Sequence, residues 1–205
     1  MLYGSYWKAA VVMGLLVLSC CSSESTQPAK KAEAAQPAVA DLVTAKTAFW
    51  AMYKSAHTWA ADLTPLAVES KEIPGIKNSS GKAAIWRATF GSPSKREARV
   101  YSYAVAAHPP DILKGITVGN GQPWNGPVPK ALPIDTSDFA TDSDAAYQTA
   151  LKQASAWASK SPDQEVSFRL GNASRFPAPV WYVLWGNEKS GHAVYVNAKT
   201  GALVK

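Results

Sequence analysis

The chain has 205 residues, of which 47% are hydrophobic and 18% charged, enough apolar material for one large or two small domains. Its formal charge of +6 comes from lysines and arginines spread along the chain without a dense basic block. No nucleic-acid-binding motif accompanies this charge. The sequence therefore argues against nucleic acid as a partner and allows only weak attraction to anionic surfaces.

The N-terminus is a predicted export signal. Lys8 precedes an apolar run from Ala9 to Leu18, whose ten residues are too few to cross a bilayer that requires about 20. The run ends Val17-Leu18-Ser19-Cys20-Cys21, which resembles a bacterial lipobox. The resemblance implies a signal peptide over residues 1–19 and a lipid on Cys20, so that acyl chains would anchor the protein to a membrane.

The chain has two cysteines, Cys20 and Cys21, and lipidation of Cys20 would leave no intramolecular disulfide. Lipidation of Cys21 would place a cysteine at the small-residue position, which is less usual, and an ordinary cleaved secretory signal is the other alternative. In Gram-negative bacteria an Asp after the lipidated Cys favours the inner membrane. Because residue 21 is not Asp, the resemblance implies the outer membrane, with the protein facing the periplasm.

Residues 20–40 are predicted to form a flexible tether. The stretch is rich in Ser, Gln, Pro, Ala and Lys and contains no aromatic residue. Such a composition buries too little apolar surface to fold.

Residues 41–120 are predicted to form a first module, a helix followed by strands. Asp41 is a candidate cap for a helix that runs to about Ala61, where Thr64-Pro65 follows. Apolar residues at helical spacing form one stripe on it: Ala45, Phe49, Met52, Ala56, Trp59, Ala60 and Leu63. Strands are expected at 66–73, 83–91, 98–107 and 115–119.

Residues 121–140 are rich in Pro and Gly and form either a stiff linker or an ordered loop. Trp124 lies in this segment and is expected to dock on a module.

Residues 141–205 then repeat the pattern of a helix followed by strands. Asp142 or Ser143 is the expected cap of a helix that runs to about Ser159. Strands are expected at 165–170, 179–186, 192–197 and 202–204.

Two strands share a pattern that indicates a tandem duplication. Residues 85–91 and 180–186 both read β-branched, Trp, any residue, small aliphatic, any residue, aromatic, Gly, at an offset of 95. Trp59 and Trp157 match at an offset of 98, and Val100-Tyr101 matches Val194-Tyr195 at 94. The predicted fold class is α+β, with two tandem helix-plus-antiparallel-sheet modules packed together.

Strand alternation separates core from candidate contact residues. One face of each repeated strand is predicted to be core: Trp86, Ala88 and Phe90 in the first copy, Trp181, Val183 and Trp185 in the second. Trp157 is also expected in the core. The other face of the second strand carries Val180, Tyr182 and Leu184, which either contact the rest of the chain or face a partner. With Trp50 on the first helix, Tyr182 and Leu184 are the candidate partner contacts.

The C-terminal stretch, residues 194–204, resembles the end of a PepSY domain. It reads Val-Tyr-Val-Asn-Ala-Lys-Thr-Gly-Ala-Leu-Val, with Asn197 in place of the family's usual Asp. A short polar side chain at 197 can bond the turn's backbone, and Gly201 can take a left-handed conformation. The resemblance implies a non-catalytic module, and some modules of the family are thought to restrain peptidases.

No catalytic or metal-binding motif is found in the sequence. His57, His108 and His192 lack partners at metal-ligand spacing, and no nucleophile elbow or Walker loop is present. We therefore expect no cofactor, no metal and no enzymatic activity, and a function in binding or restraining a peptidase or envelope protein. The alternatives are a structural envelope protein without a discrete ligand, and an enzyme whose site is assembled in space.

We predict that the mature protein in the membrane fraction starts at Cys20 and carries an acyl mass increment. Intact mass spectrometry of the wild type beside Cys20→Ala measures this, because the thioether cannot form on alanine. An unmodified mass starting near Ser22, or an uncleaved chain, would contradict the prediction.

Overall fold

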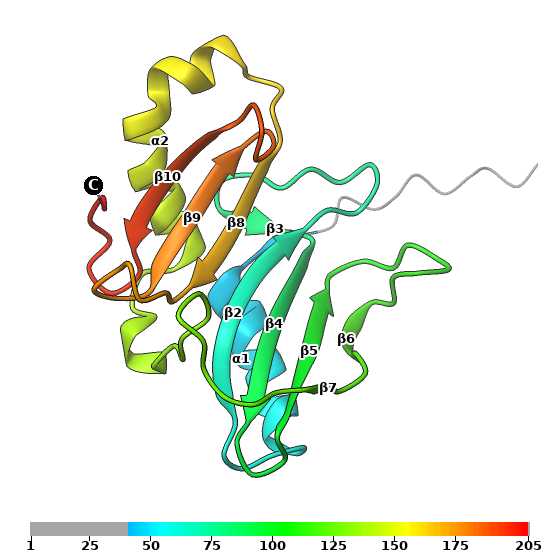
Figure 1. Ribbon diagram of the computed structural model, residues 1–205. Helices are drawn as coiled ribbons and strands as arrows, with labels where there is room; N and C mark the ends of the chain where they lie inside the picture. Colours follow the sequence, from blue (N-terminus) through cyan, green and yellow to red (C-terminus); the bar gives the residue numbers. More distant parts are fainter. Residues whose placement is uncertain (1–40, 205) are drawn as a thin grey trace, which may run out of the picture. The chain divides into compact units, whose positions relative to one another are not determined.

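The computed structural model describes residues 41–204. The predicted signal peptide (1–19), the lipidation site Cys20 and the tether (20–40) lie outside the described residues. Within them the fold is α+β, as predicted: two helices cover one face of an eight-stranded sheet whose pairings are all antiparallel (Figure 1).

The two predicted helices and all but one of the predicted strands form in the predicted order, with boundaries shifted by a few residues. The strand expected at 202–204 is wrong, because only an isolated bridge between Leu203 and Val196 forms there. The first half contains β1 (Val43–Thr44), α1 (Ala45–His57), β2 (Thr64–Lys71), β3 (Lys82–Ala83), β4 (Ile85–Ser92), β5 (Glu97–Ala104), β6 (Gly115–Val118) and β7 (Gln122–Pro123). The second contains the 3-10 turn η1 (Thr136–Asp138), α2 (Ser143–Lys160), β8 (Val166–Gly171), β9 (Val180–Trp185) and β10 (His192–Asn197).

One sheet runs through both predicted modules. Its strand order is β10-β9-β8-β2-β4-β5-β6, with β7 beside β5, while β1 and β3 form a separate two-stranded sheet. The junction is the antiparallel pairing of β2 with β8, in which Glu69 lies opposite Arg169. The two halves are therefore joined by backbone hydrogen bonds as well as by packed side chains.

The core lies between the sheet and the two helices. The side chains predicted to face it on β4 and β9 are all buried: Trp86, Ala88, Phe90, Trp181, Val183 and Trp185. They form one cluster with the apolar stripes of both helices, so the two halves share a core. Trp157 was expected in the core and is instead half-buried against its margin.

Matched contacts recur in the two halves. The indole nitrogen of Trp86 donates to the carbonyl of Val43 at 2.9 Å, and that of Trp181 donates to the carbonyl of Thr141 at 2.9 Å. In both halves a helix aromatic packs on the last aromatic of a strand, with ring centroids 5.8 Å apart for Phe49–Phe90 and 6.0 Å for Tyr147–Trp185.

The two tryptophans near the helix ends also occupy matching places. The Arg99 guanidinium lies 4.9 Å from the ring centre of Trp59, and the His192 ring stacks on Trp157 at 5.8 Å. Each partner lies early in the return strand, β5 or β10. Trp59 and Trp157 therefore make equivalent contacts with the return strands of their halves.

The alignment predicted for the return strands is wrong by one residue. Tyr101 lies opposite Ala88, and Val194 lies opposite Val183, the equivalent of Ala88. Tyr101 therefore matches Val194, and both are buried. Matching Tyr101 to Tyr195 would place equivalent residues on opposite faces, because strand side chains alternate.

The predicted cap of the first helix is also wrong. Asp41 precedes β1, and the N-cap of α1 is Thr44, whose side chain makes no capping bond. The second helix supplies the missing acceptors: Ser143 Oγ accepts from the Ala45 N–H at 2.9 Å, and Asp142 Oδ1 accepts from the Lys46 N–H at 3.0 Å. Asp142 also accepts from Ser143 N–H at 2.7 Å, as predicted for the cap of α2.

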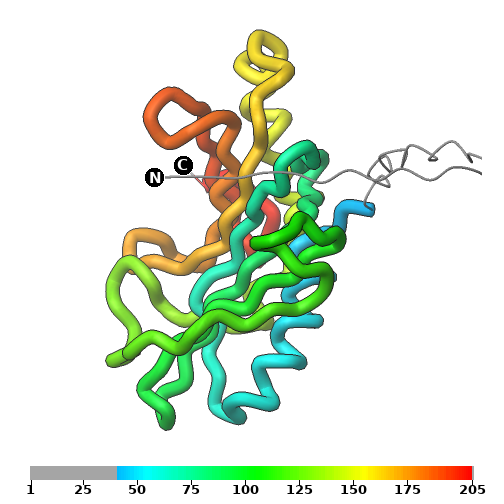
Figure 2. Tube along the Cα trace, turned by 90° about the vertical axis from the view of Figure 1, so that its right-hand side faces the viewer, coloured from blue at the N-terminus to red at the C-terminus, as the bar shows by residue number. Residues whose placement is uncertain are grey.

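The Pro- and Gly-rich segment 121–140 is an ordered loop rather than a spacer. It crosses the face of the sheet away from α1 (Figure 2). The Ile134 N–H donates to the carbonyl of Pro65 at 2.8 Å, and the Ile134 side chain is buried in the common core. Trp124 docks as predicted: its ring lies so close over Gly91 that a Cβ there would meet it at 2.9 Å.

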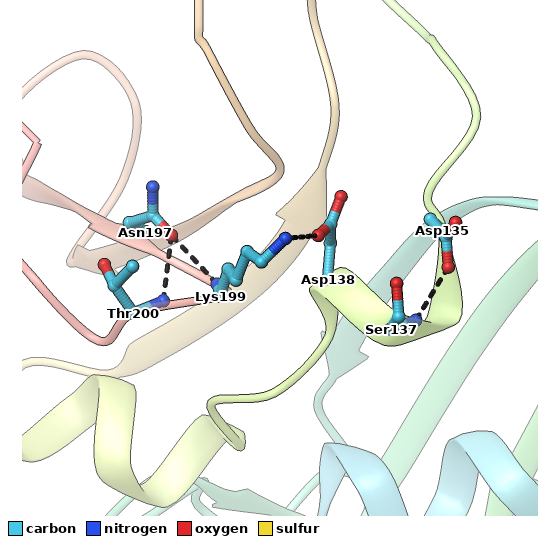
Figure 3. A network of polar contacts seen from close by, with 6 residues as sticks. All are labelled: Asp135, Ser137, Asp138, Asn197, Lys199 and Thr200. Atoms are coloured by element: carbon cyan, nitrogen blue, oxygen red, sulfur yellow. Dashed lines mark hydrogen bonds and ion pairs between the residues drawn. The ribbon is translucent and has the colours of Figure 1, made fainter.

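The turn at the C-terminus has the predicted geometry. Asn197 Oδ1 accepts from the backbone N–H groups of Lys199 and Thr200, at 2.9 and 3.0 Å, and Gly201 has a φ of +72° (Figure 3). Lys199 Nζ lies 2.8 Å from Asp138, and this ion pair raises the pKa of Lys199. The turn is thereby joined to the end of the 121–140 loop.

Ser143→Ala is expected to lower the free energy of unfolding by about 1–3 kcal/mol, since it leaves the buried Ala45 N–H without an acceptor. Urea denaturation measures the loss. Ser155→Ala, on the exposed side of the same helix, is the matched control and should change stability by less than about 0.5 kcal/mol. Equal effects from the two variants would show that the Ser143 bond contributes nothing.

Candidate functional site

A pocket of about 670 Å³ lies on the helix-free face of the second half. Alternation along β8, β9 and β10 sends Phe168, Trp181 and Val194 into the core and the residues beside them to the other face. The register aligns three of these outward residues across the strands, because Tyr182 lies opposite both Arg169 and Tyr195. Arg169, Tyr182 and Tyr195 form the floor of the pocket.

Two loops build the walls. Pro129 and Lys130 of the long loop line the pocket, and so do residues 172–176, which follow β8. The Ser174 N–H donates to the carbonyl of Pro129 at 2.8 Å, and the Leu132 N–H donates to the carbonyl of Asn172 at 2.9 Å. The two loops are therefore neighbours that are held together by backbone hydrogen bonds.

An arginine lies over the aromatic side chains of the pocket. The Arg175 guanidinium carbon is 4.6 Å from the ring centre of Phe176 and 5.6 Å from that of Tyr195. One of its nitrogens donates to the Tyr195 hydroxyl at 3.3 Å. Tyr195 in turn packs against Phe176 and Tyr182, with ring centroids 5.2 Å apart in each pair. These contacts favour a guanidinium placed beside the two rings.

The lining carries an excess of positive charge. Lys130, Arg169 and Arg175 line the pocket together with one carboxylate, Glu188. The ion pairs between residues 41 and 204 are Lys71–Glu69, Arg99–Glu97 and Lys199–Asp138, none of which includes a cation of the pocket. Such a site favours an anionic ligand with some apolar surface.

Tyr182 remains a neutral phenol in this setting. Burial raises its pKa above the usual value of 10.0, because the phenolate would lose hydration, and the nearby Tyr195 and Glu188 raise the pKa further. At neutral pH its hydroxyl can both donate and accept a hydrogen bond.

The structure separates the three predicted contact residues. Tyr182 lies in the pocket, and Leu184 follows on the same face of β9 but is only 6% exposed, packed where Gly191 passes over it. Trp50 is 48% exposed and lies on α1, in the helix layer on the other side of the sheet. Tyr182 and Trp50 therefore cannot contribute to one contact surface.

Sequence reasoning missed Lys130, Arg169, Arg175 and Tyr195. Tyr195 could have been found, because pairing β9 with β10 across the predicted 187–191 turn sets it opposite Tyr182. Lys130 and Arg175 lie in loops, which lack the regular periodicity that predicts side-chain direction in helices and strands. Their neighbours can therefore be identified only in the folded chain.

Two of the three histidines make aromatic contacts, and His108 is exposed beyond the end of β5. His57 packs edge-on against Tyr53 at 4.6 Å, and His192 stacks on Trp157. Across residues 41–204 no three His, Cys, Asp or Glu side chains gather closely enough to hold a metal ion. In the same range no helix is both long and apolar enough to cross a membrane.

A second hollow, of about 840 Å³, lies in the first half between residues 73–76 and 103–108. Its lining is mostly small or apolar, and its charged residues Asp41 and Lys114 are of opposite sign. It lacks the excess of charge and the aromatic floor of the first pocket.

Comparison with known proteins leaves the family open. No family model matches the chain, and no curated protein matches it. A similar solved structure is that of a "putative lipoprotein" from Clostridium difficile 630, with 11% identity over 77% of this chain and 90% of that one, and a TM-score of 0.48. A likeness of this size carries no argument about function.

Replacing Glu188 with Gln should lower the pKa of the Tyr182 phenol, because a negative charge that opposes its ionisation is removed. NMR titration of tyrosine ring carbons at alkaline pH measures it, with Tyr182→Phe used to assign the signal. Glu165→Gln, a carboxylate outside the pocket lining, is the charge-matched control. A Tyr182 pKa unmoved by Glu188→Gln would contradict this account of the pocket's charges.

Proposed function

We propose that this protein is a lipid-anchored lipoprotein of the bacterial cell envelope that binds or restrains another protein and catalyses no reaction. The observation that supports binding is the pocket, whose lining combines aromatic rings with three cations that have no ion pair in the described chain. Exposed aromatic and arginine side chains are the groups that most often dominate protein interfaces.

The location belongs to the same proposal. The lipobox-like sequence that ends at Cys20 supports an acylated N-terminus, and Cys21 in place of Asp supports the outer membrane facing the periplasm. The 20–40 stretch would hold the folded unit away from the bilayer, where the pocket can meet a partner.

We also propose that the fold arose from duplication of one PepSY-like module. Three pairs of contacts support duplication because they recur at equivalent positions: the indole bonds of Trp86 and Trp181, the packing of Phe49 and of Tyr147, and the packing of Trp59 and of Trp157. The Asn197 turn supports the resemblance, because its side chain makes the backbone bonds that the motif requires. The module type implies a peptidase as one kind of partner.

Photo-crosslinking in cells tests the binding proposal. A benzophenone amino acid at position 182 is expected to give a discrete crosslinked protein, and the same group at Lys152, on the exposed side of α2, is expected to give none. Crosslinks of equal pattern at both positions would mean unspecific contact. No crosslink at 182, in cells where the protein is present and folded, would favour the structural alternative without a discrete ligand.

A further inference from the structure

We propose that the pocket on the helix-free face of the second half binds an acidic side chain presented by a short extended peptide of the partner. This inference rests on the proposed function, since it names the chemistry that the same site recognises. The occupant is a peptide whose Asp or Glu carboxylate pairs with Arg175 while its neighbouring residues lie on Tyr182 and Tyr195.

Arg175 lies in the pocket lining with donors available for a carboxylate. A guanidinium carries five N–H donors in a planar fork, and Arg175 uses one nitrogen for the Tyr195 hydroxyl. The contacts with the rings of Phe176 and Tyr195 favour this placement of the guanidinium, which reduces the side-chain entropy lost on binding. A carboxylate matches the spacing of two parallel donors in that plane.

The other charged residues of the pocket lining also favour an anionic ligand. Lys130 and Arg169 approach from the loop and from β8, against the single carboxylate of Glu188, so the lining has a formal excess of two positive charges (three cations minus one anion). Tyr182 and Tyr195 line the same pocket. A ligand that fills the pocket must therefore combine negative charge with apolar surface, as an acidic peptide does.

The shape favours a peptide over a lipid surface. A membrane surface is recognised by clustered basic residues that lie on its plane, whereas these cations surround a hollow of about 670 Å³. That volume lies within the range of about 300–1,000 Å³ found for discrete ligand sites. A few side chains of an extended segment fit such a space.

The first half lacks the same chemistry at the equivalent positions. Arg87 takes the place of Tyr182, because each follows the matched strand tryptophan, and Ser102 takes the place of Tyr195, because each lies opposite that residue. The core contacts of the two halves are alike, but this surface differs. Arg87 is exposed on the same face and outside the pocket, so it provides a matched control.

The test uses the full-length protein in detergent and two pools of fluorescein-labelled octapeptides. Both pools vary Ala, Val, Leu and Tyr at six positions; one fixes Glu at the other two, and the second fixes Gln. Fluorescence polarisation is expected to show the Glu pool bound at least tenfold more tightly, and less tightly as salt rises. Arg175→Gln should weaken binding of the Glu pool about tenfold, Arg175→Lys less, and Arg87→Gln should leave it unchanged.

Arg169→Gln gives the same test from a strand, should Arg175→Gln disturb the loop, and should also weaken binding of the Glu pool. Equal binding of both pools, absence of binding, or equal loss from Arg87→Gln would each overturn the acidic-peptide inference. Anionic vesicles that bind in an Arg175-dependent way while the Glu pool does not would overturn it in favour of a lipid surface. A crosslink at position 182 that persists in any of these cases leaves the protein-binding proposal standing, and loss of the crosslink removes that proposal as well.

Discussion

The two α-helices of residues 41–204 start beside each other, and the Asp142 carboxylate and the Ser143 hydroxyl bond to their first residues. Helix N-termini carry unpaired N–H groups and a partial positive charge, so two of them side by side repel each other unless an acceptor lies between. Asp142 accepts from the backbone of both α1 and α2, and Ser143 completes the first turn of α1. The position of each helix on the sheet therefore depends on the other helix.

Further contacts near the start of α2 join the two halves of the sheet. Gly81, in the connection between β2 and β4, lies against the start of α2 so closely that a Cβ there would fall 2.3 Å from the Cα of Asp144. Beside it Asn78 is buried and donates to the carbonyl of Val166 at 3.3 Å, and Ser70 accepts from the Phe168 N–H at 2.9 Å across the β2–β8 seam. The two halves thus share helix ends, a strand pairing and one core, and neither has a complete set of contacts alone.

With both helices on one face, the other face of the sheet must be covered by connections. The 121–140 loop and residues 172–176 cross it and bond to each other, and the pocket lies where they leave the strands uncovered. Loops that are fixed at both ends can hold cations such as Lys130 and Arg175 over an aromatic floor without pairing them. A rigid sheet with functional side chains on its loops is a common way to build a recognition site.

The sequence by itself determined the two helices, the alternation that buries Trp86 and Trp181, and the Asn197 turn, because each depends on backbone geometry within a few residues. It also indicated Tyr182 as an outward residue. Only the tertiary structure decided that α1 is capped from residues far along the chain, that β2 pairs with β8, and that Arg175 lies over Tyr195. Those contacts join segments that are far apart in the sequence. Because no periodic pattern of residues accompanies them, they cannot be predicted from the sequence alone.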